Sequence, residues 1–590
     1  MSARYRPITG INAMFIEEAV MNDAIDRSRD LSQPLDRLGP DESMKDRSDY
    51  LRGTIAKGLL DRITGAIPSD DDVKLMKFHG IYQQDDRDLR DERRRQKLEP
   101  AYQFMIRVRM PGGVCSPAQW LKLDELARAH GGNTLRITTR QTVQFHWVLK
   151  DSLRPVIQGL HETLLDTIAA CGDDSRGVMC TVDPQSSRLH AEVAAMAKHV
   201  SDHVIPKTRA YHEIWYGNQR VAGTEPEEPF YGRTYLPRKF KIGFALPPSN
   251  EIDVYAQDLG FIAIEGPSGL AGFDVVIGGG MGRTDQAPET YPRLASLIGF
   301  IPADRVIACA DAVMTVHRDY GDRKDRQRAR FKYTIDDKGL DWVKAEIERA
   351  MGFPFEEARE FTFSSNGDSF CWNVTPDGRH HRTLLVENGR LDLKLLDMLR
   401  DVARIHRGTF RLTPNQNVII AAVAAEDRAA IDAVLAEQWP DLDDLSTLRR
   451  HAMACVALPT CGLAMAESER YMPTLLDKIE LLLAEHGLSG EPITIRMSGC
   501  PNGCSRPYIA EIGLTGRAPG KYNLYLGGGF HGERLNRMIR ENVGEQVILK
   551  VLGEALGRFA RERQVGEHFG DFTIRAGIVR PVTEGRFFNE

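Results

Sequence analysis

The sequence lacks any apolar run long enough to cross a bilayer. A membrane-spanning helix needs about 20 consecutive apolar residues, whereas the 590 residues of this chain have a mean hydropathy of -0.35 and charges throughout. It also lacks an excess of positive charge: the formal net charge is -6, which disfavours nonspecific attraction to polyphosphate backbones. We therefore expect neither a membrane-embedded protein nor a nucleic-acid partner.

The first thirty residues lack the apolar core of a secretory signal and are too acidic for an organellar transit peptide. Cysteine is scarce as well. The nine cysteines are an odd number scattered over a long chain, which is unlike a small secreted disulfide scaffold. We therefore expect a cytoplasmic protein in a reducing compartment, where clustered thiolates indicate a metal site.

A chain of this length is too long for one hydrophobic core and is expected to form several domains that can enclose large cofactors. Its first forty residues combine a short helical pattern, from Phe15 to Ala24, with a polar stretch that contains proline. This predicts a peripheral arm. Further on, opposite charges interleave in QQDDRDLRDERRRQKLEP, which favours a solvated helix with ion pairs over a docking surface.

An internal repeat sets the expected architecture. The segment from Phe104 to Val148 predicts the order strand, helix, strand, turn, strand, and the segment from Arg382 to Val423 repeats it. NTLRITTRQTVQFHWV and GTFRLTPNQNVIIAAV align without gaps, and the pairs that match are Arg136 with Arg411, Thr138 with Thr413 and Gln141 with Gln416. We predict one module used twice. Because Asn415 replaces Arg140 in the second copy, one of the two pseudo-symmetric sites is expected to be vestigial.

A second, weaker repeat links FDVVIGGGMGR with YNLYLGGGFHG, each an apolar strand pattern that runs into a glycine cluster. Glycine in this place indicates a close approach of backbone. The cluster from Gly278 to Gly282 does not match a dinucleotide-binding loop, because the Gly-x-Gly-x-x-Gly pattern would need glycine where Arg283 stands. Electrons for any redox chemistry are therefore expected from another polypeptide.

The strongest chemical signal is a quartet of cysteines. Cys455 and Cys461 have five residues between them, and Cys500 and Cys504 have three. Two close pairs suit a 4Fe-4S cluster, in which each iron needs one thiolate, while the five-residue gap with Pro459 inside it suits structural zinc poorly. Glycine and proline around the second pair break any helix, so that backbone amides can wrap the cluster. The other five cysteines are expected to be buried apolar residues.

The patterns MACVALPTCGLAMAESER and GCPNGCSRPYIAEIGL resemble the cluster-binding signature of the sirohaem-dependent sulfite and nitrite reductases. KFHGIYQQDDRDLR, LRITTRQTVQFH, TYLPRKFKIGFALPP and GDFTIRAGIVRPV resemble the bacterial sulfite reductase haemoprotein branch, and the likeness spans residues 42–581. It implies an α+β fold in which duplicated ferredoxin-like modules form a pseudo-two-fold unit beside two α/β domains that bind sirohaem and the 4Fe-4S cluster. The expected divisions are an N-terminal arm (1–41), an N-terminal extension (42–98), a first module (99–170), a central sirohaem and substrate domain (171–350), a second module (351–440) and a C-terminal 4Fe-4S and sirohaem domain (441–590).

The resemblance also implies the site residues. The cluster would be held by Cys455, Cys461, Cys500 and Cys504, and Cys504 would bridge it to the sirohaem iron. Sulfite would be bound and protonated by Arg107, Arg176, Lys239 and Lys241. The sirohaem would be lined by Arg136, Arg140, Gln144 and His146. In a strand, Lys239 and Lys241 share one face; without the resemblance they would be interpreted as part of a solvated edge strand.

Two further positions carry expectations. The basic run from Arg323 to Lys332 is by default a solvated helix face, although its place in the family implies that some of its cations reach sirohaem carboxylates. Ser505 stands where glycine often follows the last cysteine, which leaves the hydrogen bonding of Cys504 sulfur open.

The implied activity is the six-electron reduction of sulfite to sulfide in sulfate assimilation and cysteine biosynthesis. The expected electron donor is an NADPH-dependent flavoprotein, with ferredoxin as the alternative. Two other interpretations stay open: a sirohaem nitrite reductase, and a nonenzymatic iron-sulfur electron carrier. Relative turnover of sulfite and nitrite tests the first, and the absorption bands of sirohaem test the second.

Overall fold

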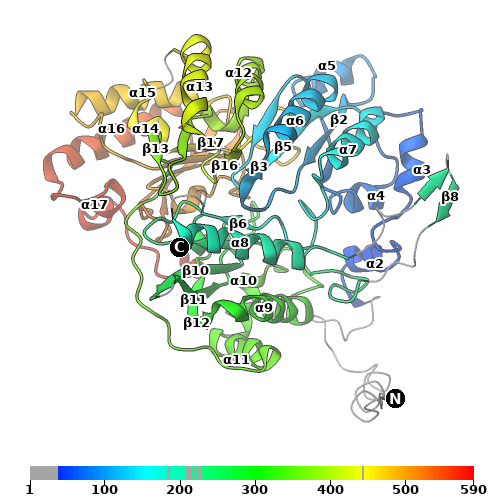
Figure 1. The fold of residues 1–590 in the computed structure, drawn as a ribbon. Helices are drawn as coiled ribbons and strands as arrows, with labels where there is room; N and C mark the ends of the chain where they lie inside the picture. The colour runs from blue at the N-terminus through cyan, green and yellow to red at the C-terminus, as the bar shows by residue number, and fades with distance from the viewer. Residues whose placement is uncertain are drawn as a thin grey trace.

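The computed structural model describes residues 37–181, 187–207, 214–216, 219–222, 228–267, 269–440 and 444–590 (Figure 1). The helical pattern expected in the N-terminal arm lies outside these residues. The described chain forms four five-stranded sheets and a two-stranded hairpin, β7 (Ile214–Tyr216) with β8 (Gln219–Ala222). Helices pack against these sheets, which confirms the α+β class. No helix in this part of the chain is both long and apolar enough to cross a membrane.

The N-terminal extension runs beside the first module and the central domain. It contains α2 (Pro40–Asp46), α3 (Ile55–Leu60), α4 (Asp70–Leu75), β1 (Ile81–Asp85) and α5 (Arg90–Arg95). α5 has no buried residue and carries an ion pair of 2.5 Å between Arg95 and Glu92, as expected of a solvated helix. The preceding QQD, however, belongs to the edge strand β1, which pairs with the first module.

The predicted repeat of strand, helix, strand, turn and strand is confirmed in both modules. The first contains β2 (Tyr102–Arg107), β3 (Val114–Cys115), α6 (Pro117–His130), β4 (Leu135–Ile137), β5 (Val143–Val148) and α7 (Leu153–Glu162). The second contains β13 (Trp372–Val374), β14 (His380–Leu384), β15 (Arg390–Leu391), α12 (Leu393–Ile405), β16 (Thr409–Leu412), β17 (Val418–Val423) and α13 (Ala425–Gln438). The side chain of Ser116 caps α6 and that of Asp392 caps α12 at matching positions.

The two modules exchange strands. The first sheet has the order β1-β2-β5-β4-β15 and the second has β13-β14-β17-β16-β3. Thus β15 of the second module adds to the first sheet beside β4, and β3 of the first module adds to the second sheet beside β16. Side chains of both modules also form one continuous buried core. The predicted joint pseudo-two-fold unit is confirmed by both observations.

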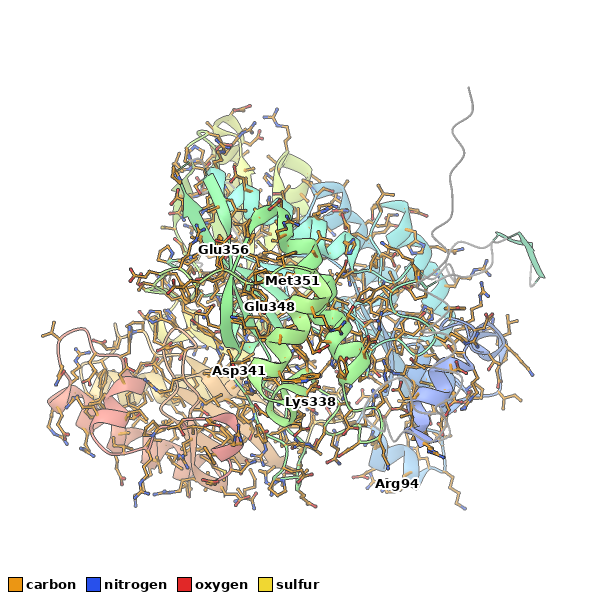
Figure 2. All side chains as sticks on the ribbon, turned by 90° about the horizontal axis from the view of Figure 1, so that it is seen from below. Arg94, Lys338, Asp341, Glu348, Met351 and Glu356 are labelled. Atoms are coloured by element: carbon orange, nitrogen blue, oxygen red, sulfur yellow. The ribbon has the colours of Figure 1, made fainter. Side chains whose placement is uncertain are left out.

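The central domain holds the third sheet, β12-β11-β10-β9-β6. Its elements are β6 (Met179–Cys180), α8 (Arg188–His203), β9 (Ile242–Ala245), β10 (Leu259–Gly266), β11 (Gly269–Ile277), β12 (Ser296–Pro302), α9 (Val306–Tyr320), α10 (Phe331–Lys338) and α11 (Leu340–Met351). α11 packs on α9 at the outside of the domain. Figure 2 shows α11 facing the viewer, with Asp341, Glu348 and Met351 along its length.

The C-terminal domain repeats the central one. Its elements are α14 (Thr447–Arg450), β18 (Ala452–Ala454), α15 (Met472–Glu485), β19 (Ile495–Ser498), β20 (Ile512–Ala518), β21 (Lys521–Leu526), β22 (Arg537–Val543), α16 (Glu545–Glu562) and α17 (Phe569–Arg575). In both sheets two parallel strand pairs are followed by two antiparallel ones. The glycine clusters follow β11 and β21 in equivalent places, where a Cβ on Gly279 or Gly528 would lie 2.2 Å from a carbonyl oxygen. The predicted second repeat is therefore confirmed.

Candidate active site

Two of the predicted anion-binding residues come from different domains and meet at one loop. Arg107 ends β2, and its Nη1 donates to Cys171 Sγ at 2.8 Å and lies 3.4 Å from Ala170 O. Arg176 precedes β6, and its Nε and Nη2 both donate to Gly172 O, while its Nη1 also lies 3.4 Å from Ala170 O. The loop therefore holds the two guanidinium groups side by side.

Lys239 and Lys241 lie immediately before β9, on either side of Phe240. Phe240 is fully buried and forms an isolated bridge with Ser175, so its two neighbours project to the opposite face of the backbone. Both lysines are half-buried, and the backbone N–H of Lys241 donates to Asp258 Oδ2 at 3.1 Å. The structure thus places the two ammonium groups on one face, in an extended segment rather than inside a strand.

Burial and the charges of nearby arginines lower the pKa values of both lysines. Burial, followed by the charges of Arg238, Arg330 and Arg176, lowers the pKa of Lys239 to about 7. Burial, followed by Arg140 and Lys239, lowers the pKa of Lys241. A lysine in such surroundings releases its proton more readily than a lysine in water.

Arg140 lies at the turn between β4 and β5 and points into the central domain. Its guanidinium donates to Gln257 Oε1 at 2.8 Å and to Gly177 O at 2.7 Å. Burial, followed by the charges of Arg176 and Arg506, lowers its pKa to about 9. The arginines and lysines of this site therefore form a cationic cluster, whose buried positive charge an anionic group would neutralise.

The other residues expected to line the sirohaem lie beside this cationic cluster. The side-chain amide of Gln144 is oriented with its oxygen toward Arg107 and accepts from Arg107 Nη2 at 2.6 Å. His146, two residues further along β5, is buried, and within the described chain neither of its ring nitrogens has a hydrogen-bond partner. Burial and the charges of Arg390 and Arg136 lower the pKa of His146, which keeps the ring neutral. An orphaned polar ring of this kind marks a place where a further group can bind.

Arg136 has a different environment. Its Nε donates to Glu469 Oε2 at 2.6 Å and its Nη2 to Ala454 O at 2.8 Å. Ala454 immediately precedes Cys455, so Arg136 connects the first module to the loop that carries the first cysteine pair.

The cysteine quartet is assembled by two neighbouring parallel strands. Cys455 follows β18, and Cys500 and Cys504 follow β19, which pairs with β18 in parallel. The carboxyl ends of the two strands therefore place both loops at one edge of the sheet. Burial, followed by the charges of Cys504, Cys455 and Cys461, raises the pKa of the Cys500 thiol, so the other three thiols of the quartet lie near it.

Backbone amides point at these thiols, as the glycine and proline content predicts. Gly499 N donates to Cys455 Sγ at 3.2 Å. A Cβ on Gly499 would lie 2.5 Å from the Cβ of Ala457, and Gly503 has a φ of +61°, so neither position accepts a larger residue without strain. No group of three or more His, Cys, Asp or Glu side chains in the described ranges is placed to hold a single metal ion. The ligands of a cubane cluster lie further apart, because each binds a different iron.

The hydroxyl of Ser505 bonds to β19 and not to Cys504. This buried hydroxyl donates to Met497 O at 2.6 Å and lies 2.7 Å from Ser498 Oγ. It therefore ties the cysteine loop to β19. The Cys504 carbonyl accepts from Thr139 Oγ1 at 3.0 Å, in the same turn as Arg140, so the end of the quartet lies beside the cationic cluster.

A buried ion-pair cluster joins the central and C-terminal domains next to the turn that carries Arg140. Asp253 and Arg506 occupy equivalent positions in the two repeats, each with a positive φ just before a short 3-10 helix. Asp253 accepts from Arg496 Nη1 at 2.6 Å and pairs with Arg506. Arg506 Nη1 in turn donates to Thr139 O at 2.9 Å. One carboxylate thus fixes the loop that carries Cys504 against the turn that carries Arg140.

We expect Asp253→Asn to destabilise the protein by about 3 kcal/mol, because breaking a buried ion pair leaves two arginines uncompensated. This loss of stability is measured by thermal unfolding, with the absorbance of the bound cofactors as the signal. As a matched control, Arg558→Gln removes the exposed 2.8 Å pair with Glu562 and should leave the unfolding curve unchanged. An unchanged midpoint in Asp253→Asn would show that the cluster is not a structural link.

The basic run from Arg323 to Lys332 is not a solvated helix face. Residues 321–330 are irregular, and α10 begins only at Phe331. Arg323, Arg330 and Lys332 are buried. Their partners lie within the protein: Arg323 pairs with Glu42 and donates to Tyr235 O at 2.7 Å, Arg330 pairs with Asp258 at 2.9 Å, and Lys332 donates to Gly282 O at 2.8 Å. The default interpretation was wrong because an alternating charge pattern does not reveal buried carboxylates elsewhere in the chain.

Two residues at the site were not predicted as such. Cys171, expected to be an inert apolar residue, accepts from Arg107. Tyr82 of β1 is hydrogen-bonded to the same thiol, and burial, followed by the charge of Cys171, raises its pKa to about 12. Nothing in the sequence marks a single cysteine or tyrosine as part of a site, because their meeting depends on the packing of the extension against the first module.

A four-thiol centre beside a cluster of buried cations is typical of a redox protein that acts on an anion next to an iron-sulfur cluster. Residues 95–163 and 374–438 match the family described as nitrite/sulfite reductase ferredoxin-like half domain, and residues 195–355 match the nitrite and sulphite reductase 4Fe-4S domain. The half-domain family matches the chain twice, once in each of the duplicated modules. The 4Fe-4S domain family matches the central domain, which is the copy of the α/β domain without the cysteine quartet.

Similar proteins extend over nearly the whole chain. A protein of Nitrosomonas europaea named sulfite reductase (NADPH) hemoprotein beta-component is 68% identical over 567 residues, which cover 96% of this chain and 99% of the relative. A protein of Staphylococcus carnosus with the same name is 55% identical over 554 residues, which cover 93% and 97%. The chain belongs to the nitrite and sulfite reductase family. The structure of the Mycobacterium tuberculosis NirA protein shares the fold, with a TM-score of 0.73 at 24% identity over 91% of this chain and 96% of that one.

Proposed function

We propose that this chain is the haem-containing subunit of an assimilatory sulfite reductase, which reduces sulfite to sulfide with six electrons. The observation that carries the proposal is the joining of a four-thiol centre and surplus buried cations at one place, where Cys504 lies beside the turn that carries Arg140. The names of the similar proteins support the substrate and the use of NADPH by the complete enzyme.

The residues fit both expected cofactors. Cys455, Cys461, Cys500 and Cys504 would hold a 4Fe-4S cluster, and Cys504 would be shared with a sirohaem. When bound, these groups supply electrons one at a time to the sulfur atom. The carboxylates of sirohaem would be neutralised by the surplus charge of Arg140 and its neighbours, and His146 offers a polar ring that has no other partner in the described chain.

The protein side chains bind the anion and supply protons. Arg107 and Arg176 would hold sulfite oxygens through forked hydrogen bonds, in exchange for part of their present bonds to Cys171, Gln144 and Gly172. Each oxygen leaves as water and so needs two protons, which Lys239 and Lys241 would deliver. The pKa of Lys239, lowered to about 7, makes it a good proton donor near neutral pH, and burial with neighbouring cations lowers the pKa of Lys241 as well. Asp258 and Phe240 hold the lysine segment in place.

We propose further that the chain works in the cytoplasm and receives electrons from an NADPH-dependent flavoprotein. The test is to assay the purified protein with sulfite and a dye reductant, then with the flavoprotein and NADPH, and to measure sulfide. Nitrite with ammonia as the product is measured in parallel. An absorption spectrum without sirohaem bands, or ammonia formation that outpaces sulfide formation at equal substrate concentration, would contradict the proposal.

The N-terminal arm is expected to serve the donor and not the chemistry. Deletion of residues 1–36 should leave sulfide formation with the dye reductant within about twofold and lower it with the flavoprotein. The deletion must stop before Gly39, because Gly39 N donates to Arg323 O at 3.0 Å and α2 begins at Pro40.

The control is a second deletion that continues through Asp46. It removes Glu42 and Lys45, which form a buried cluster with Arg323, and should therefore lower stability and cofactor content. Loss of sirohaem absorbance in the shorter deletion would mean that the arm belongs to the core. Equal rates with the flavoprotein in the shorter deletion and the intact chain would exclude a role in docking.

A further inference from the structure

A segment of the N-terminal extension reaches from the first module to the cysteine loop of the C-terminal domain. Arg87 lies in this segment, between β1 and α5, and its backbone N–H donates to Pro459 O at 3.1 Å. Its Nη1 donates to Cys461 O at 3.0 Å and also to Ala464 O. One arginine thus binds three carbonyl groups of the turn that carries Cys461.

The same turn directs backbone amides at the thiol of Cys461. Burial, followed by the charge of Cys504, raises the pKa of this thiol, while hydrogen bonds from the backbone N–H groups of Leu463 and Ala464 and the charge of Arg87 counter the rise. These three groups therefore favour negative charge on the sulfur. The carbonyl groups that Arg87 binds belong to the same short turn as the two amides, so the arginine side chain also fixes the position of these donors.

The guanidinium of Arg87 forms no ion pair within the described part of the chain. Arg90 and Arg95 of the same charged stretch pair with acidic residues nearby, and the adjacent Asp88 pairs with Arg470 at 2.6 Å. Arg87 instead binds a turn that lies 374 positions further along the chain. Its side chain is half-buried, so water screens its charge less than that of a fully exposed arginine.

We propose that Arg87 is a positioning residue for the 4Fe-4S cluster, which holds the Cys461 turn in its ligating conformation and raises the reduction potential of the cluster. The potential of such clusters depends on net charge, on hydrogen bonds to the sulfurs and on exposure to solvent. Arg87 acts on the first two of these. Its charge favours the additional electron of the reduced cluster, and its hydrogen bonds keep the amides of the turn directed at the sulfur. The inference rests on the cluster of the proposed function, and not on which anion is reduced.

The experiment compares the intact holoenzyme with three variants of Arg87. Arg87→Met removes the charge and the hydrogen bonds, Arg87→Gln removes the charge but keeps an amide donor, and Arg87→Lys keeps the charge. The midpoint potential of the cluster is measured by reductive titration with mediator dyes and electron paramagnetic resonance. We expect a shift to a more negative potential in Arg87→Met and Arg87→Gln, and a smaller shift in Arg87→Lys. Release of iron to a chelator should be severalfold faster in Arg87→Met than in the intact protein.

Arg470→Met is the matched control. Arg470 also connects the N-terminal extension to the C-terminal domain, since it pairs with Asp88 and Glu467, but this side chain is exposed and none of its hydrogen bonds reaches the Cys461 turn. Because water screens an exposed charge, Arg470→Met should keep the midpoint potential and the rate of iron release of the intact protein. A shift in Arg470→Met equal to that in Arg87→Met would mean that any lost cation at this junction has the same effect, and would overturn the proposal.

Two further results would overturn it. One is an unchanged midpoint potential in an Arg87→Gln protein that retains its iron. The other applies if Arg87→Met is isolated without iron: equal midpoint potentials in Arg87→Gln and Arg87→Lys would show that the charge of Arg87 does not act on the cluster. Failure of the proposed function gives a different result, because the intact protein would then lack iron or sirohaem before any substitution is made.

Discussion

Cys504→Ser should abolish nearly all sulfite reduction while the protein stays folded. A serine oxygen is a hard, weakly basic donor and replaces a soft bridging thiolate poorly. Cys504 is exposed, and its loop is held independently of the thiol by the hydrogen bonds of Ser505 to Met497 and of Arg506 to Thr139. The substitution therefore removes a ligand without removing what positions it.

The measurements are sulfide formation, iron content and the electronic spectra of the purified protein. The coupling between haem and cluster should be lost even where some of each remains bound. Cys309→Ala and Cys115→Ala are the matched controls, because both thiols are fully buried in the hydrophobic core, far from any charge that lowers their pKa. Both should keep full iron content. Normal turnover and spectra in Cys504→Ser would refute the assignment of the bridge.

The architecture was predictable because both the ferredoxin-like module and the α/β domain occur twice in the sequence. Alignment of the turns at Arg140 and Asn415 identified the modules, and the glycine clusters identified the duplicated α/β domains. The reciprocal exchange of β3 and β15 was not predictable, since strands of two residues carry no periodicity that distinguishes them from a loop. It follows from tertiary packing alone.

Part of the candidate site could also be predicted from the sequence, and part depends on the fold. Sequence spacing identified the cysteine quartet, and the structure shows how two parallel strands place it. The carboxylates that pair with the buried arginines could not be predicted, because no sequence pattern marks Asp253 or Asp258. Only the fold brings Asp253 to Arg496 and Arg506, and Asp258 to Arg330. Pairing of this kind decides which cations are structural. Among the described residues, Arg140, Lys239 and Lys241 have no such ion pair, and neighbouring cations add to burial in lowering their pKa values.

These unneutralised lysines lead to the second large expected effect. Replacing Lys239 or Lys241 with methionine should lower kcat by about 100-fold or more, the usual contribution of a general acid, and change KM much less. Methionine keeps the length of the side chain and removes both its charge and its protons. Arg107→Lys or Arg176→Lys should instead raise KM, since a single ammonium cannot reproduce a forked contact with an oxyanion.

The pH profile separates proton delivery from simple attraction. The active form of a proton donor is the protonated one, which is present below its pKa and lost as the pH rises through it. The surroundings lower the pKa of Lys239 to about 7, and the carboxylates of a bound sirohaem would raise it again, so kcat of the intact enzyme should fall as the pH rises above neutral. Lys239→Arg and Lys241→Arg keep the charge but do not release a proton in this range, so both should lose kcat and retain sulfite binding.

Lys338→Met is the surface control, because Lys338 is exposed at the end of α10, as Figure 2 shows. It should behave as the intact enzyme at every pH. All variants are compared at equal sirohaem content, with a dye reductant and sulfite varied from far below to far above KM. If Lys241→Arg keeps normal kcat, charge alone is required at that position and the lysine holds a carboxylate. If Lys239→Met keeps normal kcat at saturating sulfite, the protons reach the sulfur by another route, and the segment before β9 serves only to bind.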